Sequence, residues 1–334
     1  MTNVGFRARS VGQARRVLER YAQEVLLGGV LVALIVFFSI FGQGFLSQIN
    51  ITGIGQSATE TGLLAIAETF VIVTGGIDLS VGAILGLAGV VGAKVMATNI
   101  GGGVPGVDIG AGIVVGLLVG GAAGLANGFM VVRMKLTPFV ATLAMLGIAG
   151  GLTLVLTDGL TVLGTPAVVA TMGNQVLAGY FTIPILVTIV AFVIGALYLH
   201  YSRFGRWAFA IGSNSSAAAD AGIPVGRHVI KVYVLAGVMA GMAGLIDLMR
   251  LGTGSPLSGV NSNLTAIAAV VIGGASRFGG VATMTGTVLG TLILSVVLSG
   301  LVLTGLQPFW ETVVTGILIA GAVGVQQLMR GNGR

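Results

Sequence analysis

Two acidic residues, Glu60 and Glu68, lie in an apolar stretch that is long enough to cross a bilayer, residues 55–74. Charged groups at bilayer depth cost about 2.5–3.5 kcal/mol on insertion scales, so they tend to face a cavity or a partner. Eight residues correspond to about 80° around a helix, which puts both on broadly the same side. They could hydrogen-bond the hydroxyl groups of a passing solute, pair with neighbouring structural groups, or carry protons.

Two neutral polar residues in apolar segments, Asn127 and Thr142, are further candidates to line a pathway. An amide within a helix favours interhelical hydrogen bonding, and threonine often bonds a carbonyl of its own helix. Asn127 belongs to a segment whose glycines recur four apart: Gly112, Gly116, Gly120, Gly124 and Gly128. This row predicts close packing against another helix, with a sliding surface in a moving protein as the alternative.

The sequence contains no recognisable group of catalytic residues. Disulfides and thiolate metal sites are excluded because there is no cysteine, and neither HExxH nor GxSxG is present. The three lysines, Lys94, Lys135 and Lys231, do not stand in a GxxxxGK[ST] phosphate loop. We therefore expect no catalytic, metal or cofactor site on this chain and no enzymatic activity, and any ATP-driven work must belong to another polypeptide.

Composition places the chain in a membrane, because 8% charged residues and a mean hydropathy of +1.05 contrast with about 25% charge in soluble domains. The predicted fold class is all-α, a polytopic membrane protein with about ten transmembrane helices. The eighth is too short to cross alone, and we expect a broken or half-crossing helix buried in protein or lining a cavity. The ten approximate ranges are 25–45, 55–74, 79–97, 109–132, 137–156, 182–200, 229–249, 263–274, 283–304 and 309–329.

The basic residues orient these spans. If the N-terminus is cytoplasmic, only Lys94 and Arg250 of the 16 Lys and Arg residues fall outside, which leaves 14 inside. This predicts ten crossings, or nine plus a re-entrant piece, with both termini cytoplasmic. The domains are then an amphipathic cytoplasmic N-terminal segment at 1–24, a single transmembrane domain at 25–329 and a cytoplasmic tail at 330–334.

The stretch TFVIVTGGIDLSVGAILGLAGVVGA, residues 69–93, carries a carboxylate in its middle. Gly75 and Gly76 can adopt positive φ and so end one helix. Asp78 or Ser80 can cap the next helix by accepting its free N–H groups, where the helix dipole favours negative charge. We therefore predict two helices joined by a capped cytoplasmic turn, with a gating role as the alternative.

Four motifs, in order, resemble permease subunits of ribose-type ABC sugar importers, within the branched-chain amino acid/ribose permease superfamily. The resemblance runs from about residue 55 to 328. The motifs are GGIDLSVGA at 75–83, LTPFVATLAMLGIAGGLT at 136–153, RFGRWAFAIGSNSSAAADAGIPV at 203–225 and LTAIAAVVIGGASRFGGVATMTGTVLG at 264–290.

The resemblance implies an ATPase-coupling helix near residues 213–222, where Ala217-Ala218-xxx-Gly222 echoes an AA-xxx-G pattern. A helix of small residues can enter a groove on a partner. Asn214 or Ser213 can cap it, and Gly222-Ile223-Pro224 can stop it. An ordinary loop with positive-inside arginines is the alternative. The predicted coupling residues are Arg203, Gly205, Arg206, Gly212, Asn214, Ala217, Ala218 and Gly222.

Function and partners also follow from the resemblance. It implies a permease subunit of a binding-protein-dependent ABC importer in the inner (plasma) membrane, which translocates a monosaccharide or similar polyhydroxylated solute into the cytoplasm. Its partners would be a second, identical or different, permease subunit, ATPase subunits that hold ATP and Mg, an extracytoplasmic solute-binding protein and lipid, but no nucleic acid. An ion-coupled secondary transporter or facilitator that acts without an ATPase is the alternative.

The chain departs from the family pattern at three positions. Asn263 and Thr265 stand where acids are common, and Ser299 stands where asparagine is usual. These changes weaken any acidic role for the eighth helix.

Overall fold

The computed structural model describes the backbone of residues 4–102, 104–307 and 309–331, and the side chains of residues 22–102, 104–307, 309–321 and 324. The described chain is helical, which confirms the all-α prediction. Its elements are α1 (Val4–Phe41), α2 (Gln48–Val73), α3 (Val81–Ala97), α4 (Pro105–Val132), α5 (Pro138–Thr157), α6 (Ala167–Asn174), α7 (Ile183–Tyr201), α8 (Arg203–Ser213), α9 (Ser215–Asp220), α10 (Val225–Leu251), α11 (Ser262–Ile272), α12 (Met284–Leu303) and α13 (Trp310–Gly331).

Six of the described helices are long and apolar enough to cross a bilayer: residues Ala22–Phe41 of α1, and α4, α5, α7, α10 and α12. Shorter apolar helices are α3, α11 and the first part of α13, Trp310–Gly321. The chain is thus a polytopic membrane protein, as predicted. Each of the ten predicted spans overlaps one of these helices or α2.

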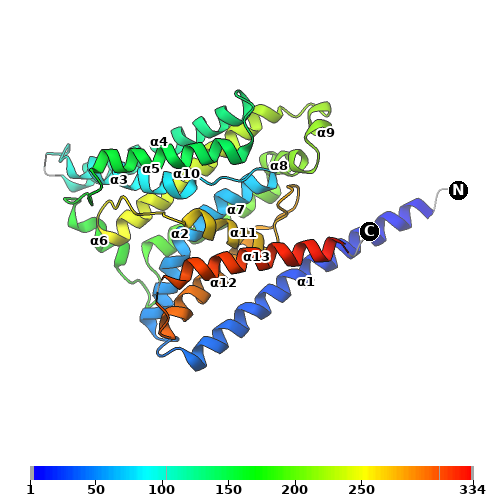
Figure 1. Cartoon of the computed structure of the whole chain (residues 1–334), viewed down its shortest axis with the longest axis horizontal. Helices are drawn as coiled ribbons and strands as arrows, with labels where there is room; N and C mark the ends of the chain where they lie inside the picture. Colours follow the sequence, from blue (N-terminus) through cyan, green and yellow to red (C-terminus); the bar gives the residue numbers. More distant parts are fainter. Residues whose placement is uncertain (1–3, 103, 308, 332–334) are drawn as a thin grey trace.

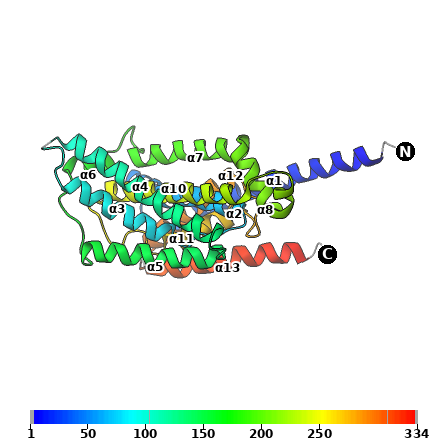
Figure 2. The ribbon, with the colours of Figure 1, turned by 90° about the horizontal axis from the view of Figure 1, so that it is seen from above.

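The glycine row of α4 packs directly against the backbone of α10. A Cβ added at Gly124 would lie 2.1 Å from the carbonyl oxygen of Tyr233, and one at Gly120 would lie 2.3 Å from that of Gly237. Only glycine permits such an approach, which maximises van der Waals contact where lipid supplies no hydrophobic drive. The predicted close packing is confirmed, and Figure 2 shows α4 and α10 side by side.

The short eighth helix is also confirmed. α11 has 11 residues, which corresponds to about 16 Å and is half of what a bilayer core requires. Beyond it the chain turns back, and the backbone N–H of Gly280 donates to the carbonyl of Val73 at the end of α2. Most of α11 is buried against its neighbours.

The two ends of the molecule differ in what they contain. In Figures 1 and 2, α8 and α9 lie at the same end as the start of α1 and the end of α13, whereas α6 lies at the opposite end. α1 is a single helix that runs unbroken from Val4 to Phe41, so the segment set apart at 1–24 continues directly into the first apolar span. The side chains of residues 1–21, which carry the predicted amphipathic face, and residues 332–334 of the predicted tail lie outside the described residues.

Candidate functional site

The stretch Gly75–Ser80 is a turn between α2 and α3, as predicted. Gly75 has a φ of +85°, a conformation that glycine adopts without strain. At Gly76 a Cβ would lie 2.9 Å from the hydroxyl of Tyr233 in α10. The turn is therefore pressed against α10, and its two glycines serve conformation and close approach.

Asp78 is fully buried and organises this turn. Its Oδ1 accepts hydrogen bonds from the Ser80 backbone N–H at 2.9 Å and from the Ser80 hydroxyl at 2.5 Å. The amide of Asn127 donates to Ser80 Oγ at 2.8 Å and lies 3.4 Å from Asp78 Oδ2. Because a buried carboxylate requires donors, the turn is fastened to α4.

The predicted capping of α3 is wrong in its detail. Ser80 occupies the N-cap position, but no side chain accepts a hydrogen bond from the first turn of α3. The Ser80 hydroxyl donates to Asp78 instead, because the buried carboxylate competes successfully for it. Asp78 reaches only the N–H of Ser80, one residue before the helix begins.

Glu68 completes a group that we call the inner polar cluster: Glu68, Asp78, Ser80, Asn127 and Tyr233. Glu68 is fully buried, and its Oε2 lies 3.4 Å from the Asp78 backbone N–H that points at it. Within the described chain, Glu68 Oε1, Asn127 Oδ1 and the Tyr233 hydroxyl have no hydrogen-bond partner. Four predicted site residues, Glu68, Asp78, Ser80 and Asn127, thus meet inside the protein. Tyr233, which no sequence motif marks, joins them.

Thr142, the fourth candidate, is fully buried beside the same turn. Its hydroxyl donates to the carbonyl of Pro138 in its own helix at 2.9 Å and lies 3.3 Å from the carbonyl of Ile77. The bond within the helix is the alternative that threonine chemistry allows. The structure therefore places Thr142 at a contact between α5 and the turn.

Glu60 lies in a different setting, on a cavity of about 210 Å³ that we call the Glu60 cavity. The hydroxyl of Ser262, the first residue of α11, donates to Glu60 Oε1 at 2.5 Å. Arg250 and Asp247 of α10 are close enough to interact electrostatically with the Glu60 carboxylate. The polar lining comes from α2, α11 and α13, and it includes Ser57, Glu60, Thr61, Ser262, Glu311 and Thr315.

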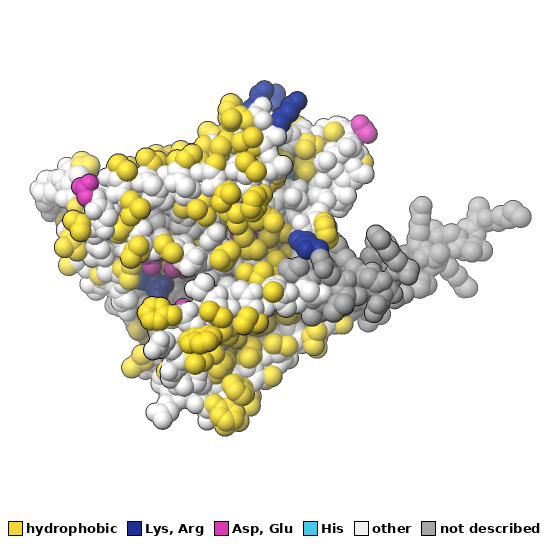
Figure 3. All heavy atoms as spheres, viewed as in Figure 1, with side chains coloured by type: hydrophobic (Ala, Val, Ile, Leu, Met, Phe, Trp, Pro, Cys, Tyr) yellow, Lys and Arg dark blue, Asp and Glu magenta, His cyan; other side chains and the backbone are white. Residues whose placement is uncertain are grey.

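Figure 3 shows acidic and basic side chains recessed in a hollow on the face that carries α13. Asp247, one turn before Arg250, accepts a hydrogen bond from the Ser258 hydroxyl at 2.5 Å. Serines from the segment before and at the start of α11 thus hold both acids. These contacts were not predictable from the sequence, because Ser258 and Ser262 belong to no motif.

The short helix predicted near residues 213–222 is present as α9. Asn214 Oδ1 accepts from the Ala217 backbone N–H at 3.0 Å, which confirms Asn214 as the N-cap. Gly222 ends the segment with a φ of +81°. Ala217 is exposed, whereas Ala218 is 5% exposed and packs inward.

α8 joins α9 to the rest of the protein. Its glycines Gly205 and Gly212, both predicted coupling residues, lie close to the backbone of other helices. A Cβ at Gly212 or Gly205 would lie 1.8 Å from the carbonyl oxygen of Val73 or Leu199, respectively. Arg203 and Arg206 are exposed on the same segment, the first stacked on Trp207 at 5.3 Å. α8 therefore contacts the end of α2 by close backbone approach at Gly212. Side chains contribute too, because the rings of Phe204 in α8 and Phe70 in α2 lie 6.0 Å apart.

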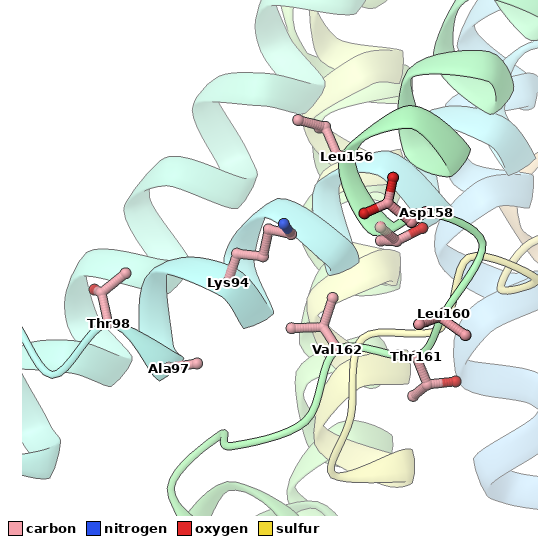
Figure 4. A pocket seen from close by; sticks show the side chains of 9 residues that line it. Lys94, Ala97, Thr98, Leu156, Asp158, Leu160, Thr161 and Val162 are labelled. Atoms are coloured by element: carbon pink, nitrogen blue, oxygen red, sulfur yellow. The ribbon is translucent and has the colours of Figure 1, made fainter.

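A second polar cavity, of about 310 Å³, lies between α3 and the end of α5. Lys94 of α3 and Asp158, the left-handed C-cap of α5, both line it, and Figure 4 shows their side chains on opposite sides of the opening. Thr157 and Thr161 complete its polar lining. The sequence did not single out this pairing as a site.

Residues 50–323 match the family described as the branched-chain amino acid transport system/permease component. The chain belongs to this permease family. It is 41% identical to the ribose import permease protein RbsC of Bacillus subtilis over 88% of this chain and 89% of that protein. It is 36% identical to the D-allose transport system permease protein AlsC of Escherichia coli, over 90% of this chain and 91% of that protein. It is 34% identical to the fructose import permease protein FrcC of Rhizobium meliloti, over 90% of this chain and 84% of that protein.

No solved structure matches the chain. The relatives confirm the resemblance to ribose-type permeases, which the four motifs indicated. Membership of this family and the six long apolar helices make the chain a multi-pass protein of the inner (plasma) membrane.

The three departures from the family pattern lie in different surroundings. Asn263 is buried in α11, and Thr265 lies on the Glu60 cavity. The Ser299 hydroxyl donates to Asn50 Oδ1 at 2.7 Å and so joins α12 to α2. The acids that line the Glu60 cavity thus lie on α2 and α13, whereas the start of α11 contributes hydroxyls and amides.

Proposed function

We propose that this chain is the transmembrane permease subunit of a binding-protein-dependent ABC importer that carries a monosaccharide or similar polyhydroxylated solute into the cytoplasm. The observation that carries the proposal is similarity over about nine-tenths of the chain to permeases named for ribose, allose and fructose import. A separate ATPase subunit drives the transport.

Coupling to the ATPase is supported by the build of α9. It is a capped helix of small residues that stands free on one side, and α8 transmits its position to the end of α2 through backbone contact. A displacement of α9 therefore passes through α8 to the end of α2, where the Gly75–Ser80 turn begins. Rigid elements of this kind carry the gating motions of transporters.

The proposed topology has ten membrane-inserted segments with both termini in the cytoplasm, and α11 enters without crossing. Its support is that the start of α1, the end of α13 and the α8–α9 segment lie at one end of the molecule. Positively charged residues favour the cytoplasmic side, and exposed Lys135, Arg203 and Arg227 are all in connecting segments or helix ends. Residues 25–329 form the permease domain between the N-terminal segment and the tail.

The working complex contains two permease chains, two ATPase subunits and a solute-binding protein on the outer side. ATP and Mg belong to the ATPase subunits, and this chain contributes no cofactor site. Membrane lipid covers the apolar outer faces of α5 and α7, on which large side chains such as Val155 and Ile194 are exposed.

Reconstitution tests the proposal. The permease is placed in vesicles with its cognate ATPase, a binding protein is added outside, and uptake of labelled ribose, allose, arabinose and fructose is measured. We expect accumulation against a gradient of one of these sugars only when ATP is inside. Uphill uptake by the isolated chain with an ion gradient alone would overturn the proposal in favour of a secondary transporter.

A variant of α9 tests the coupling step separately. Ala217→Asp adds a charge to the exposed face of α9, so we expect loss of ATPase copurification and of uptake with unchanged membrane insertion. Ala217 is preferred over Ala218, since a charge at the buried Ala218 would disturb folding. The matched control is Ala167→Asp in α6, also exposed but at the opposite end, which should retain the ATPase.

A further inference from the structure

The Glu60 cavity combines three unrelated parts of the chain. Glu60 lies near the middle of α2, about 18 Å from its start and about 20 Å from its end at 1.5 Å per residue. The first turn of the non-crossing helix α11 and the first two turns of α13 form its other walls. Solute sites of membrane transporters are characteristically built where a discontinuous helix starts.

The polar groups on this cavity are short of partners. Thr315 is 5% exposed and lines the cavity, yet no hydrogen bond joins its hydroxyl to another described residue. The same holds for the described side chains of Ser57, Thr61 and Glu311. Elsewhere, buried threonines such as Thr69 and Thr291 bond a carbonyl one turn earlier in their own helix. Hydroxyl and carboxyl groups that line a cavity without a protein partner are free to bind a ligand or water.

The donor and acceptor types fit one class of ligand. Carboxylates accept hydrogen bonds, and hydroxyls both donate and accept. Arg250 and Asp247 both act on the Glu60 carboxylate, and their charges oppose each other. A neutral molecule with several hydroxyl groups can satisfy such a lining without bringing in a charge.

We propose that the Glu60 cavity is the place where the permease binds its polyhydroxylated solute during translocation, with Glu60 of α2 and Glu311 and Thr315 of α13 as the hydrogen-bonding contacts. This inference rests on the proposed function and adds the binding site within the membrane domain. Movement of α13 or α11 away from α2 opens the cavity and releases the solute.

The absence of cysteine from the chain allows a direct test. Thr312→Cys and Ser57→Cys place single thiols on opposite walls of the Glu60 cavity, and Ser57→Cys serves as a second reporter if the first variant folds poorly. Thr161→Cys on the Lys94–Asp158 cavity is the matched control. The rate of maleimide labelling is measured in the permease–ATPase complex, with and without the sugar that the reconstituted complex takes up.

We expect the transported sugar to slow labelling of Thr312→Cys and Ser57→Cys at least about threefold and to leave Thr161→Cys unchanged. Equal labelling rates with and without sugar, in a complex that still drives ATP-dependent uptake, would overturn this inference and leave the proposed function intact. Protection by NaCl without sugar would instead identify a cation site and also overturn it. Failure of ATP-dependent uptake itself would count against the proposed function.

A substitution pair provides a second readout. Thr315→Val removes a hydroxyl from the cavity, and we expect uptake per ATP hydrolysed to fall about threefold to tenfold, as for the loss of one hydrogen bond. Thr291→Val removes a hydroxyl of similar burial that bonds its own helix and should leave this ratio unchanged. Equal ratios for the two variants would contradict the assignment of Thr315.

Discussion

Two acids on one helix, eight residues apart, have different surroundings. Glu68 is fully buried in the inner polar cluster and faces the Asp78 backbone. Glu60 is partly exposed, borders a cavity and is held by one serine at the start of α11. Residue type and helical position therefore do not distinguish a structural acid from one that can meet a solute.

The two acids differ in whether a cavity lies beside them. Around Asp78 and Glu68, α4, α10 and the turn all contact the cluster. Its unpartnered atoms, Glu68 Oε1, Asn127 Oδ1 and the Tyr233 hydroxyl, are enclosed in the protein. Around Glu60 several hydroxyls face the cavity without protein partners. We infer that the inner cluster sets the geometry of the turn beneath α8, whereas the Glu60 cavity is available for binding.

The largest expected effect is on stability in the inner cluster. Asp78→Ala would leave the Ser80 N–H and the Ser80 hydroxyl buried without an acceptor and would remove the longer contact of the Asn127 amide. We expect the free energy of unfolding to fall by about 3 kcal/mol or more, since each unsatisfied group costs about 1–3 kcal/mol. Thermal unfolding in detergent measures this, and Glu60→Ala should shift the midpoint much less. Equal shifts for the two variants would remove the distinction between the regions.

A smaller loss of stability is expected at Asn127. Asn127→Ala removes one donor to Ser80 Oγ and a longer contact to Asp78. We expect a destabilisation of about 1–3 kcal/mol, because the cluster loses its only described link to α4 through a side chain. Thermal unfolding that matches the unmodified chain would show that the link to α4 does not matter.

Sugar uptake should depend more on Glu60 than on Glu68, the reverse of the order expected for stability in the two regions. Glu60→Gln keeps the shape of the side chain but removes a charged acceptor. We expect sugar uptake to fall at least about tenfold, since a hydrogen bond to a charged group contributes about 1.5–3 kcal/mol. We expect little change in unfolding. Glu68→Gln should keep the uptake of each folded complex near that of the unmodified chain. Both rates are measured per ATPase subunit in vesicles. A larger transport defect in Glu68→Gln than in Glu60→Gln would reverse our assignment of the two acids.

The smallest expected effect concerns the serine that holds Glu60. Ser262→Ala removes the donor to Glu60 Oε1 and frees the carboxylate to move. We expect a change in uptake of a few-fold, corresponding to about 0.5–1.5 kcal/mol, and no change in thermal unfolding. An unfolding shift as large as that of Asn127→Ala would show that the Ser262–Glu60 contact is structural.

Features coded by local sequence were predictable. The turn at Gly75–Ser80, the capped helix that begins after Asn214 and the short helix near residue 263 all rest on residues within one or two turns of each other. Close packing along the α4 glycines was predictable too, because a four-residue spacing defines one helix face.

Contacts between distant residues were not predictable. Glu60 and Ser262 are 202 residues apart, and no periodicity connects them. Tyr233 joins the inner cluster because α10 packs against the turn. Capping by Ser80 was mispredicted since local rules do not include a buried carboxylate that competes for the hydroxyl.

The most direct test of this account is a cryo-electron microscopy structure of the permease–ATPase complex trapped with the transported sugar. We predict density for the sugar between Glu60 and the first turns of α13, no ligand density beside Glu68 and Asp78, and α9 seated in the ATPase. Sugar bound beside Glu68, or α9 free of the ATPase, would contradict it.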